Sequence, residues 1–257
     1  MIHLLTARLR QGYRTQVFPP ASNPLPERFR GLPVLHPDRC PEDCRACADA
    51  CPTGAIGVEH GLKLDLGRCL FCPACAEACP QNAVEYTREY ALASTSREGL
   101  VLSQENLRPK VEALQGEMKR LFGRSLKLRQ VSAGGCNGCE ADLNVLSTVG
   151  FDLGRFGIQF VASPRHADGI VVTGPVTRNM ADALRSTYEA VPAPKLVILS
   201  GACALSGGTF AGSPAVAGMP DDIPVDLYIP GCPPHPLTVL EGLLRLLGRI
   251  ESGNERT

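Results

Sequence analysis

Twelve cysteines carry the chemistry that this sequence can do, and their spacing divides them into three sets of four. The first set comprises Cys40, Cys44, Cys47 and Cys51. The second comprises Cys69, Cys72, Cys75 and Cys79, and the third comprises Cys136, Cys139, Cys203 and Cys232. The opening residues lack the apolar core and cleavage site of a secretory leader, so we expect a reducing compartment. There, so many thiols indicate metal binding or catalysis before structural disulfides.

The second set has the spacing C-x2-C-x2-C-x3-C-P, which is typical of bacterial two-cluster ferredoxins. In that motif three cysteines bind one [4Fe–4S] cluster and the fourth crosses to the other cluster. Under this rule the first predicted cluster is bound by Cys40, Cys44, Cys47 and Cys79. The second predicted cluster is bound by Cys69, Cys72, Cys75 and Cys51.

An internal repeat supports a module with two similar halves. "ADACPTGAI" at 48–56 corresponds to "AEACPQNAV" at 76–84, with an offset of 28 residues. Cys40 and Cys44 are separated by one residue more than the motif requires, which leaves room for an altered potential. Two zinc sites are the chemical alternative, but they usually use two C-x2-C pairs separated by a longer loop.

The third set follows predicted strands. Cys136 and Cys139 come after a strand at 126–132, Cys203 after one at 195–201 and Cys232 after one at 225–231. Parallel strands in open α/β sheets bind ligands beyond their carboxyl ends, so we expect these four thiols to converge on one crevice. A thioredoxin-type pair would use only two of them, whereas a zinc site or a third [4Fe–4S] cluster would use all four.

The remaining pattern predicts four segments. They are a basic, proline-rich extended arm (1–35), a two-cluster ferredoxin-like α+β domain (36–90), a helical linker (91–124) and an α/β domain (125–257). The linker helix is expected to begin near Pro109 and to end at Gly123. In the last segment, apolar strands alternate with helices, which predicts a flavodoxin-like, doubly wound and mostly parallel sheet. The other expected elements are strands at 158–163 and 168–174 and helices at 141–149, 179–191 and 236–250.

Two further observations limit the function. The 26 acidic and 26 basic residues balance, so charge favours neither nucleic acid nor an anionic membrane surface, and no apolar run is long enough to span a bilayer. The sequence also contains no P-loop and no G-x-G-x-x-G motif.

Two parts of the chain resemble subunits of known enzymes. The segment 36–90 resembles the two-cluster ferredoxin-like subunits of complex I and of membrane-bound, complex-I-related [NiFe] hydrogenases such as formate hydrogenlyase. The arm before it resembles the arm by which those subunits dock onto neighbours. "GGCNGCE", "GPVTRNM", "GACA" and "PGCPP" resemble, in this order, the small proximal-cluster subunit of the same enzymes. Spaced cysteines such as Cys136 and Cys139 are the pattern of the hydrogenase branch, because complex I typically has adjacent ones.

This resemblance implies a fusion of two normally separate electron-transfer subunits. Such a chain carries three [4Fe–4S] clusters and no substrate-converting centre. It relays electrons between a ferredoxin or formate-dehydrogenase-type partner and a [NiFe] centre in a large partner subunit. Membrane-embedded complex-I-like subunits would hold it peripherally on the cytoplasmic membrane face. The alternatives are a subunit of a nickel-free or quinone-reducing, complex-I-like oxidoreductase and a structural zinc-binding assembly protein.

Glu140 is the one candidate outside the cysteines. It directly follows Cys139, and in related hydrogenases an acidic residue near this position is associated with proton movement towards the metal centre. The alternative is an acid in the first turn of a helix, stabilised by the helix dipole.

Overall fold

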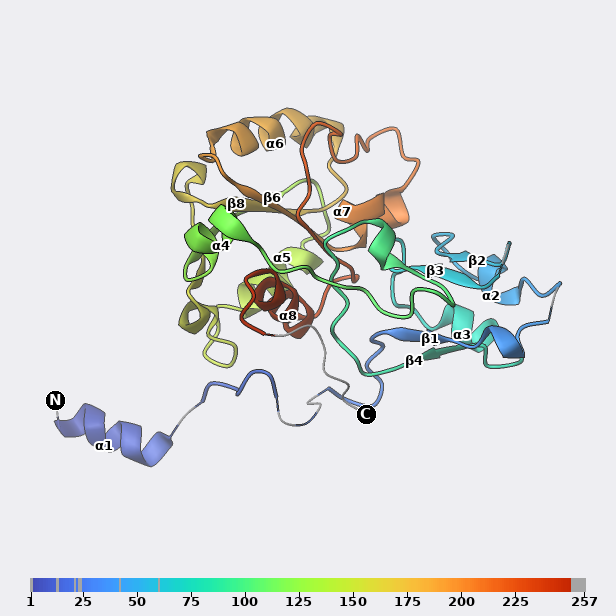
Figure 1. Cartoon of the computed structure of the whole chain (residues 1–257), viewed down its shortest axis with the longest axis horizontal. Coiled ribbons are helices and arrows are strands. Elements are labelled where there is room, and N and C mark those ends of the chain that lie inside the picture. Colours follow the sequence, from blue (N-terminus) through green and yellow to red (C-terminus); the bar gives the residue numbers. More distant parts are fainter. Residues whose placement is uncertain are drawn as a thin grey trace.

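The fold is organised around a five-stranded parallel sheet in the second half of the chain (Figure 1). The computed structural model describes residues 2–12, 14–20, 22, 25–41, 43–59 and 61–250. The sheet strands are β6 (Leu126–Ser132), β7 (Ile158–Phe160), β8 (Gly169–Thr173), β9 (Leu196–Ser200) and β10 (Leu227–Ile229). Their spatial order is β10-β9-β8-β6-β7, and every neighbouring pair is parallel. Counted from the first strand of the sheet this is the order 2-1-3-4-5, in which the direction of winding reverses between β6 and β8.

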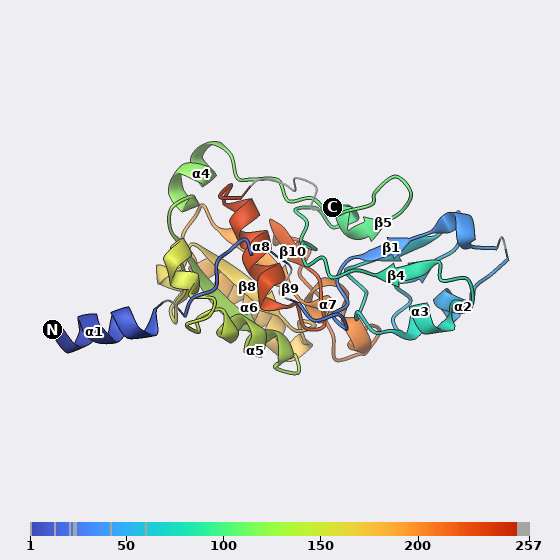
Figure 2. The same cartoon turned by 90° about the horizontal axis from the view of Figure 1, so that it is seen from below.

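Helices cover both faces of this sheet, as Figures 1 and 2 show. The helix α6 lies on one face, whereas α5 and α8 contact each other on the opposite face. Their bounds, with those of the short α7, are α5 (Gly138–Val145), α6 (Arg178–Ala190), α7 (Ala202–Ser206) and α8 (Pro236–Leu246). Short 3-10 turns complete this half: η3 (Leu153–Phe156), η4 (Pro164–His166) and η5 (Gly208–Phe210).

Burial on both faces explains the uninterrupted apolar runs of the central strands. In β8, Ile170 and Val172 pack in the core under α6, while Val171 between them packs in the core under α8. Successive side chains of a strand point to opposite faces, so a sheet that is covered twice needs apolar residues at every position. The predicted parallel α/β sheet is therefore confirmed, and β6 has the predicted bounds.

The first half of the chain forms a smaller module with two small sheets. In one, β1 (Pro33–Leu35) pairs with β4 (Val84–Tyr86) in antiparallel register. The other contains β2 (Ile56–Gly57), β3 (Lys63–Asp65) and β5 (Val101–Leu102). Between the strands lie the helices α2 (Ala46–Asp49) and α3 (Ala74–Ala78) and the 3-10 turns η1 (Pro37–Arg39) and η2 (Glu98–Leu100). Each copy of the sequence repeat therefore gives a short helix followed by a strand, α2 with β2 and α3 with β4.

Backbone pairing and shared side chains join the module to the α/β domain. Ser94 exchanges two backbone hydrogen bonds with Tyr228 of β10, at 2.8 and 3.0 Å. The side chains of Tyr228 and of Leu205 in α7 each pack against the module core and against the core under α6. Within the module, Arg97 makes a bidentate ion pair with Asp65, at 2.8 and 2.7 Å, which is the geometry of the stronger charge-assisted pairs.

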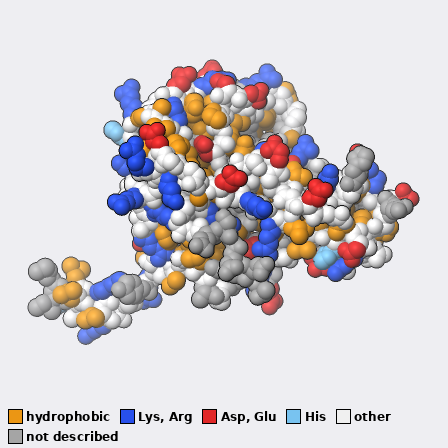
Figure 3. All heavy atoms as spheres, in the orientation of Figure 1, with side chains coloured by type: hydrophobic (Ala, Val, Ile, Leu, Met, Phe, Trp, Pro, Cys, Tyr) orange, Lys and Arg blue, Asp and Glu red, His pale blue; other side chains and the backbone are white. Residues whose placement is uncertain are grey.

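The expected extended arm is wrong at both ends. It begins with a helix, α1 (Ile2–Gln11), and its last three residues are the strand β1 of the module. Figures 1 and 2 show α1 standing away from the rest of the molecule, and Figure 3 shows apolar and basic side chains on it. The middle of the arm packs on the chain's own body, where Phe18 contacts the rings of Tyr90 and Phe156.

The expected linker helix is wrong over most of its length. The helix α4 (Gly116–Phe122) begins seven residues after Pro109. Val111 is buried in the core under α8, and the N–H of Leu114 donates to the carbonyl of Leu246, so this stretch is bound to the α/β domain. Gly116 has φ +53°, which interrupts a helix that would approach from the preceding residues. Among the described residues, no helix has the length and apolar character needed to cross a bilayer.

Removing buried side chain volume from α8 tests this packing. Leu243 is 1% exposed in the core between α8 and the sheet, so Leu243→Ala is expected to lower the free energy of unfolding by about 2–5 kcal/mol. Leu121→Ala is the control, because Leu121 is 43% exposed on α4, and we expect a change within about 0.5 kcal/mol. The shift in the urea midpoint measures both; equal shifts would show that α8 does not seal this core.

Candidate metal centres

The third set of cysteines meets at the carboxyl edge of the parallel sheet. Cys136 and Cys139 lie where the chain leaves β6 and starts α5, Cys203 lies in α7 after β9, and Cys232 follows β10. In the sheet, β8 lies between β6 and β9. The four thiols therefore come from the ends of three strands, β6, β9 and β10, and meet across the end of β8. Gly174, in the loop after β8, packs backbone to backbone against Gly135, which directly precedes Cys136.

Electrostatic coupling shows that the four thiols share one neighbourhood. Burial and then the charges of Glu140, Cys203, Cys232 and Cys136 raise the pKa of Cys139 to about 12. Burial and the charges of Cys232 and Cys136 likewise raise the pKa of Cys203. Four thiolates this close oppose one another's ionisation, and a bound cation reverses that penalty because a metal ion deprotonates a coordinating thiol. This donor set therefore fits a metal cofactor.

Glycines make room beside the sulfurs. A Cβ atom added to Gly201 would lie 2.4 Å from the Sγ of Cys139, and one added to Gly208 would lie 2.9 Å from the Sγ of Cys203. Gly201 also has φ +96°, a conformation that favours glycine. The crowding means that these positions accommodate no side chain without moving a ligand sulfur.

The third set opens onto the molecular surface. Cys136 and Cys232 are exposed, whereas Cys139 and Cys203 are half-buried. The exposed pair lies at the edge formed by the loops after β6 and β10. A cofactor held by these four residues would therefore be accessible to a partner from one side.

Glu140 is buried beside this set, in the first turn of α5. Its Oε1 accepts hydrogen bonds from the hydroxyls of Ser132 (2.6 Å) and Thr173 (2.7 Å), at the ends of β6 and β8. Burial opposes ionisation, but these two hydroxyls outweigh it and hold the pKa of the Glu140 carboxyl below its usual value. The residue is thus a fixed, hydrogen-bonded carboxylate at the helix start, in the position of a stabilised first-turn acid.

Mutual electrostatic effects divide cysteines of the first two sets into two groups of neighbours. Burial and then the charges of Cys44 and Cys79 raise the pKa of Cys40, and Cys79 and Cys40 act in the same way on Cys47, whose pKa rises to about 11. In the other group, burial raises the pKa of Cys69 to about 12, with contributions from Cys75 and Cys51. The fourth cysteine of each run therefore neighbours the other run.

Four cysteines of the second group line one small pocket together with Tyr86. They are Cys51, Cys69, Cys72 and Cys75. Backbone N–H groups point at their sulfurs, with 3.2 Å from Ala55 N to Cys51 Sγ and 3.2 Å from Phe71 N to Cys69 Sγ. The Tyr86 hydroxyl lies 3.4 Å from Cys75 Sγ, and burial raises the pKa of Tyr86. Thiols bordering a shared space, with donors aimed at the sulfurs, fit an iron–sulfur cluster. Across the described ranges, no three His, Cys, Asp or Glu side chains are arranged to hold a single metal ion.

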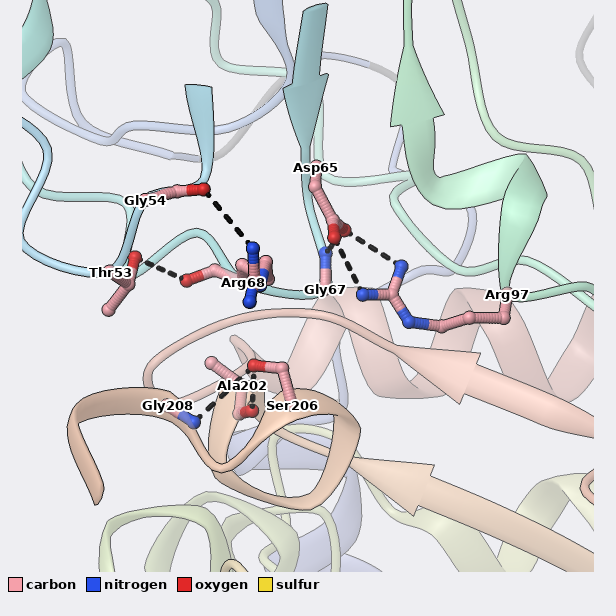
Figure 4. Close-up of polar contacts among 9 residues, drawn as sticks. All are labelled: Thr53, Gly54, Asp65, Gly67, Arg68, Arg97, Ala202, Ser206 and Gly208. Carbon is pink, nitrogen blue, oxygen red and sulfur yellow. Dashed lines mark hydrogen bonds and ion pairs between the residues drawn. The ribbon is translucent and has the colours of Figure 1, made fainter. Parts of the chain in front are cut away.

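The second group lies on the side of the module that faces the third set. In Figures 1 and 2, α3, which carries Cys75, lies nearer to the α/β domain than α2, which carries Cys47. Figure 4 shows Arg68, the residue before Cys69, over the turn of α7 that contains Ala202 and Ser206. Leu205 of that turn packs against the module core. The three sets therefore follow one another along the molecule.

Comparison with known proteins assigns the family. Residues 136–246 match the family described as NADH ubiquinone oxidoreductase, 20 Kd subunit. A probable membrane-bound hydrogenase subunit of Pyrococcus furiosus is 40% identical over 144 residues, which cover 56% of this chain and 86% of that protein. An NADH-quinone oxidoreductase subunit of Citrifermentans bemidjiense is 47% identical over 118 residues, 46% of this chain and 68% of that protein. The chain belongs to this 20 kDa subunit family.

A third relative extends the family comparison to another hydrogenase system. Formate hydrogenlyase subunit 7 of Escherichia coli is 42% identical over 142 residues, 55% of this chain and 56% of that protein. The predicted kinship with small subunits of complex I and of complex-I-related hydrogenases is therefore confirmed. The matched range 136–246 begins at Cys136 and includes all four cysteines of the third set.

Three residues contact the sites through the fold rather than through a sequence motif. Ser132 and Thr173 hold Glu140, but they lie 8 residues before and 33 residues after it, and only the pairing of β6 with β8 joins them. Tyr86 lies beside sulfurs 11 and 17 residues upstream. The repeat could have indicated Tyr86, because the corresponding position of the first copy is Val58.

Replacing Gly201 tests the crowding around the third set. Gly201→Ala is expected to lower the iron content of the anaerobically purified chain by about four atoms, because the new Cβ displaces the Cys139 sulfur. Gly212→Ala is the matched control, since Gly212 also has a positive φ (+80°) but no atom within 4 Å of the added Cβ. Both variants place a Cβ at a positive φ, but only Gly201→Ala crowds a sulfur, so equal iron content in the two would contradict the geometry described for the site.

Proposed function

We propose that this chain is the electron-transfer subunit of a membrane-associated, hydrogenase-like oxidoreductase complex and that it carries three [4Fe–4S] clusters. One observation carries the proposal: four thiols of a 20 kDa-family domain converge at the carboxyl edge of its sheet, and two of them are exposed. When bound, [4Fe–4S] clusters supply reversible one-electron transfer. The chain itself would convert no substrate.

The twelve cysteines would bind the three clusters in groups of four. Cys40, Cys44, Cys47 and Cys79 would hold the outer cluster. Cys69, Cys72, Cys75 and Cys51 would hold the middle cluster. Cys136, Cys139, Cys203 and Cys232 would hold the cluster at the sheet edge. Leu205, two residues after Cys203, packs against the module core, and this contact supports a relay between the last two groups.

The partners follow from the exposed edge and from the relatives. A site with Cys136 and Cys232 exposed requires a covering subunit if the cofactor is to be shielded from solvent. Relatives named as subunits of a membrane-bound hydrogenase and of formate hydrogenlyase favour a large [NiFe] subunit and membrane-embedded complex-I-like subunits as those partners. A ferredoxin or a formate-dehydrogenase-type protein would exchange electrons at the outer cluster. The complex would lie on the cytoplasmic membrane face.

Glu140 is proposed as a proton relay at this interface. Ser132, which donates to its carboxylate, also lines a surface cavity of about 610 Å³ between α6 and the edge of the sheet at β7. The cavity gives solvent access up to the hydroxyl, and the hydroxyl connects it to the carboxylate. A proton could therefore pass from the cavity to Glu140 by way of Ser132.

A subunit of a quinone-reducing, nickel-free complex is the second candidate, because the NADH-quinone oxidoreductase relative is 47% identical. The two-residue gap between Cys136 and Cys139 favours the hydrogenase reading over this one. Metal analysis of the complex that co-purifies with this chain separates them. The hydrogenase reading predicts about one nickel per large subunit, and a nickel-free complex that reduces a quinone would establish the second candidate.

Removing one ligand of the third set tests the relay. In the purified complex of wild-type chain, hydrogen gas is expected to reduce all three clusters. In Cys203→Ser, the clusters of the module are expected to stay oxidised under hydrogen and to be reduced by dithionite, because the only connection to the large subunit has been cut. Electron paramagnetic resonance of the frozen samples reports the reduced clusters.

Leu121→Ala serves as the control, since it is remote from the cysteines and exposed. It should behave as the wild type. Reduction of the module by hydrogen in Cys203→Ser, at the wild-type extent, would contradict the relay through the third set.

A further inference from the structure

Tyr86 ends the strand β4 with its hydroxyl beside two sulfurs of the second cysteine group. The oxygen lies 3.4 Å from the Sγ of Cys75 and 3.9 Å from the Sγ of Cys69. The side chain is half-buried, packs against the module core and lines the pocket that the four sulfurs share. A thiolate bound to iron has no proton to give, so the phenol must be the donor in both contacts.

The internal repeat shows that this contact belongs to one half of the module only. A shift of 28 residues relates Ala83 to Ala55 and Tyr86 to Val58. The backbone contacts obey the repeat: the N–H of Ala55 donates to Cys51 and the N–H of Ala83 donates to Cys79, both at 3.2 Å. The side chains do not obey the repeat, because Val58, at the position that corresponds to Tyr86, has no hydrogen-bond donor. Tyr86 therefore breaks an otherwise similar pair of sulfur environments.

We propose that the Tyr86 hydroxyl is a potential-setting donor, which raises the reduction potential of the cluster held by Cys69, Cys72, Cys75 and Cys51 above that of its partner in the module. This inference rests on the proposed function. A hydrogen bond to a cluster sulfur withdraws negative charge and stabilises the reduced, more negative state. The half-buried position strengthens the effect, because a lower local dielectric screens the hydroxyl dipole less than water does.

The position of the second cysteine group determines how the proposed difference in reduction potential would affect electron transfer. The helix α3, which carries Cys75 of this group, lies between α2 and the α/β domain in Figures 1 and 2, and Leu205 of α7 packs against the module core. A higher potential there makes the middle cluster the first of the two in the module to be reduced. Of the two clusters that the module would hold, the middle one would therefore carry the electron when the module takes up only one.

Removing the hydroxyl tests the proposal. In the full chain, Tyr86→Phe is expected to shift the midpoint potential of the middle cluster to a more negative value and to leave the other two unchanged. Redox titration followed by electron paramagnetic resonance measures the midpoints, and Cys44→Ser and Cys72→Ser assign the signals of the module. Tyr228→Phe is the matched control, because Tyr228 packs against the same module core and should leave all three midpoints unchanged.

A second variant covers the case in which Tyr86→Phe fails to hold its cluster. A 3-fluorotyrosine at position 86 keeps the shape of the side chain but makes the phenol a stronger donor, so the midpoint of the middle cluster should become less negative. An unchanged midpoint in either variant with full iron content, or equal shifts of all three clusters, would overturn the inference. A chain without iron would instead overturn the proposed function on which the inference rests.

Discussion

Crowding of four thiols at one edge of a parallel sheet is the constraint on which the rest of this structure depends. The sulfurs come from the ends of three strands, and each raises the cost of ionising its neighbours. Parallel strands point all their carboxyl ends at the same edge, so the topology alone brings the residues within reach. Glycine at position 201 and the backbone contact of Gly174 with Gly135 then remove the side chains that would fill the space. A cofactor that supplies positive charge resolves the repulsion.

The smaller module likewise depends on its cysteines, which form part of its core. Its strands are two or three residues long, and cysteines contribute to its core beside leucines such as Leu64 and Leu100. A unit of this size lacks the buried apolar surface that sustains larger domains, and bound metal commonly supplies the missing stability. The Asp65–Arg97 ion pair and the pairing of Ser94 with Tyr228 then fix the module against the α/β domain. Rigid placement suits the proposed relay, which needs redox centres that stay in reach of one another.

Sequence reasoning succeeded where the pattern is local. The strand β6 and the start of α8 lie where the apolar periodicity predicts them, because strands buried on both faces have a strong signal. It failed in the linker, where the contacts of Val111 with a distant core override a helical pattern. It also treated residues 1–35 as one extended arm, although the helical periodicity of α1 and the pairing of β1 with β4 divide that segment.

In the candidate sites, too, local spacing could be predicted from the sequence, whereas contacts between distant residues could not. The spacing of the cysteines suggested which of them belong together, since the crossing rule is a property of the motif. The partners of Glu140 and the contact of Tyr86 with sulfur needed the fold, because each joins residues brought together only by strand pairing or by the closing of the module. Donors that tune a site are short-range in space but not in sequence. A sequence motif therefore does not reveal such donors.

Mössbauer spectroscopy of the iron-57-enriched, anaerobically purified chain, combined with its metal content, decides whether the twelve cysteines hold three iron–sulfur clusters. The account predicts about twelve iron atoms per chain, all with the signature of [4Fe–4S] clusters, and no stoichiometric zinc. A colourless chain that contains zinc at the cysteine sites, or one with iron sufficient for only the module, would contradict it.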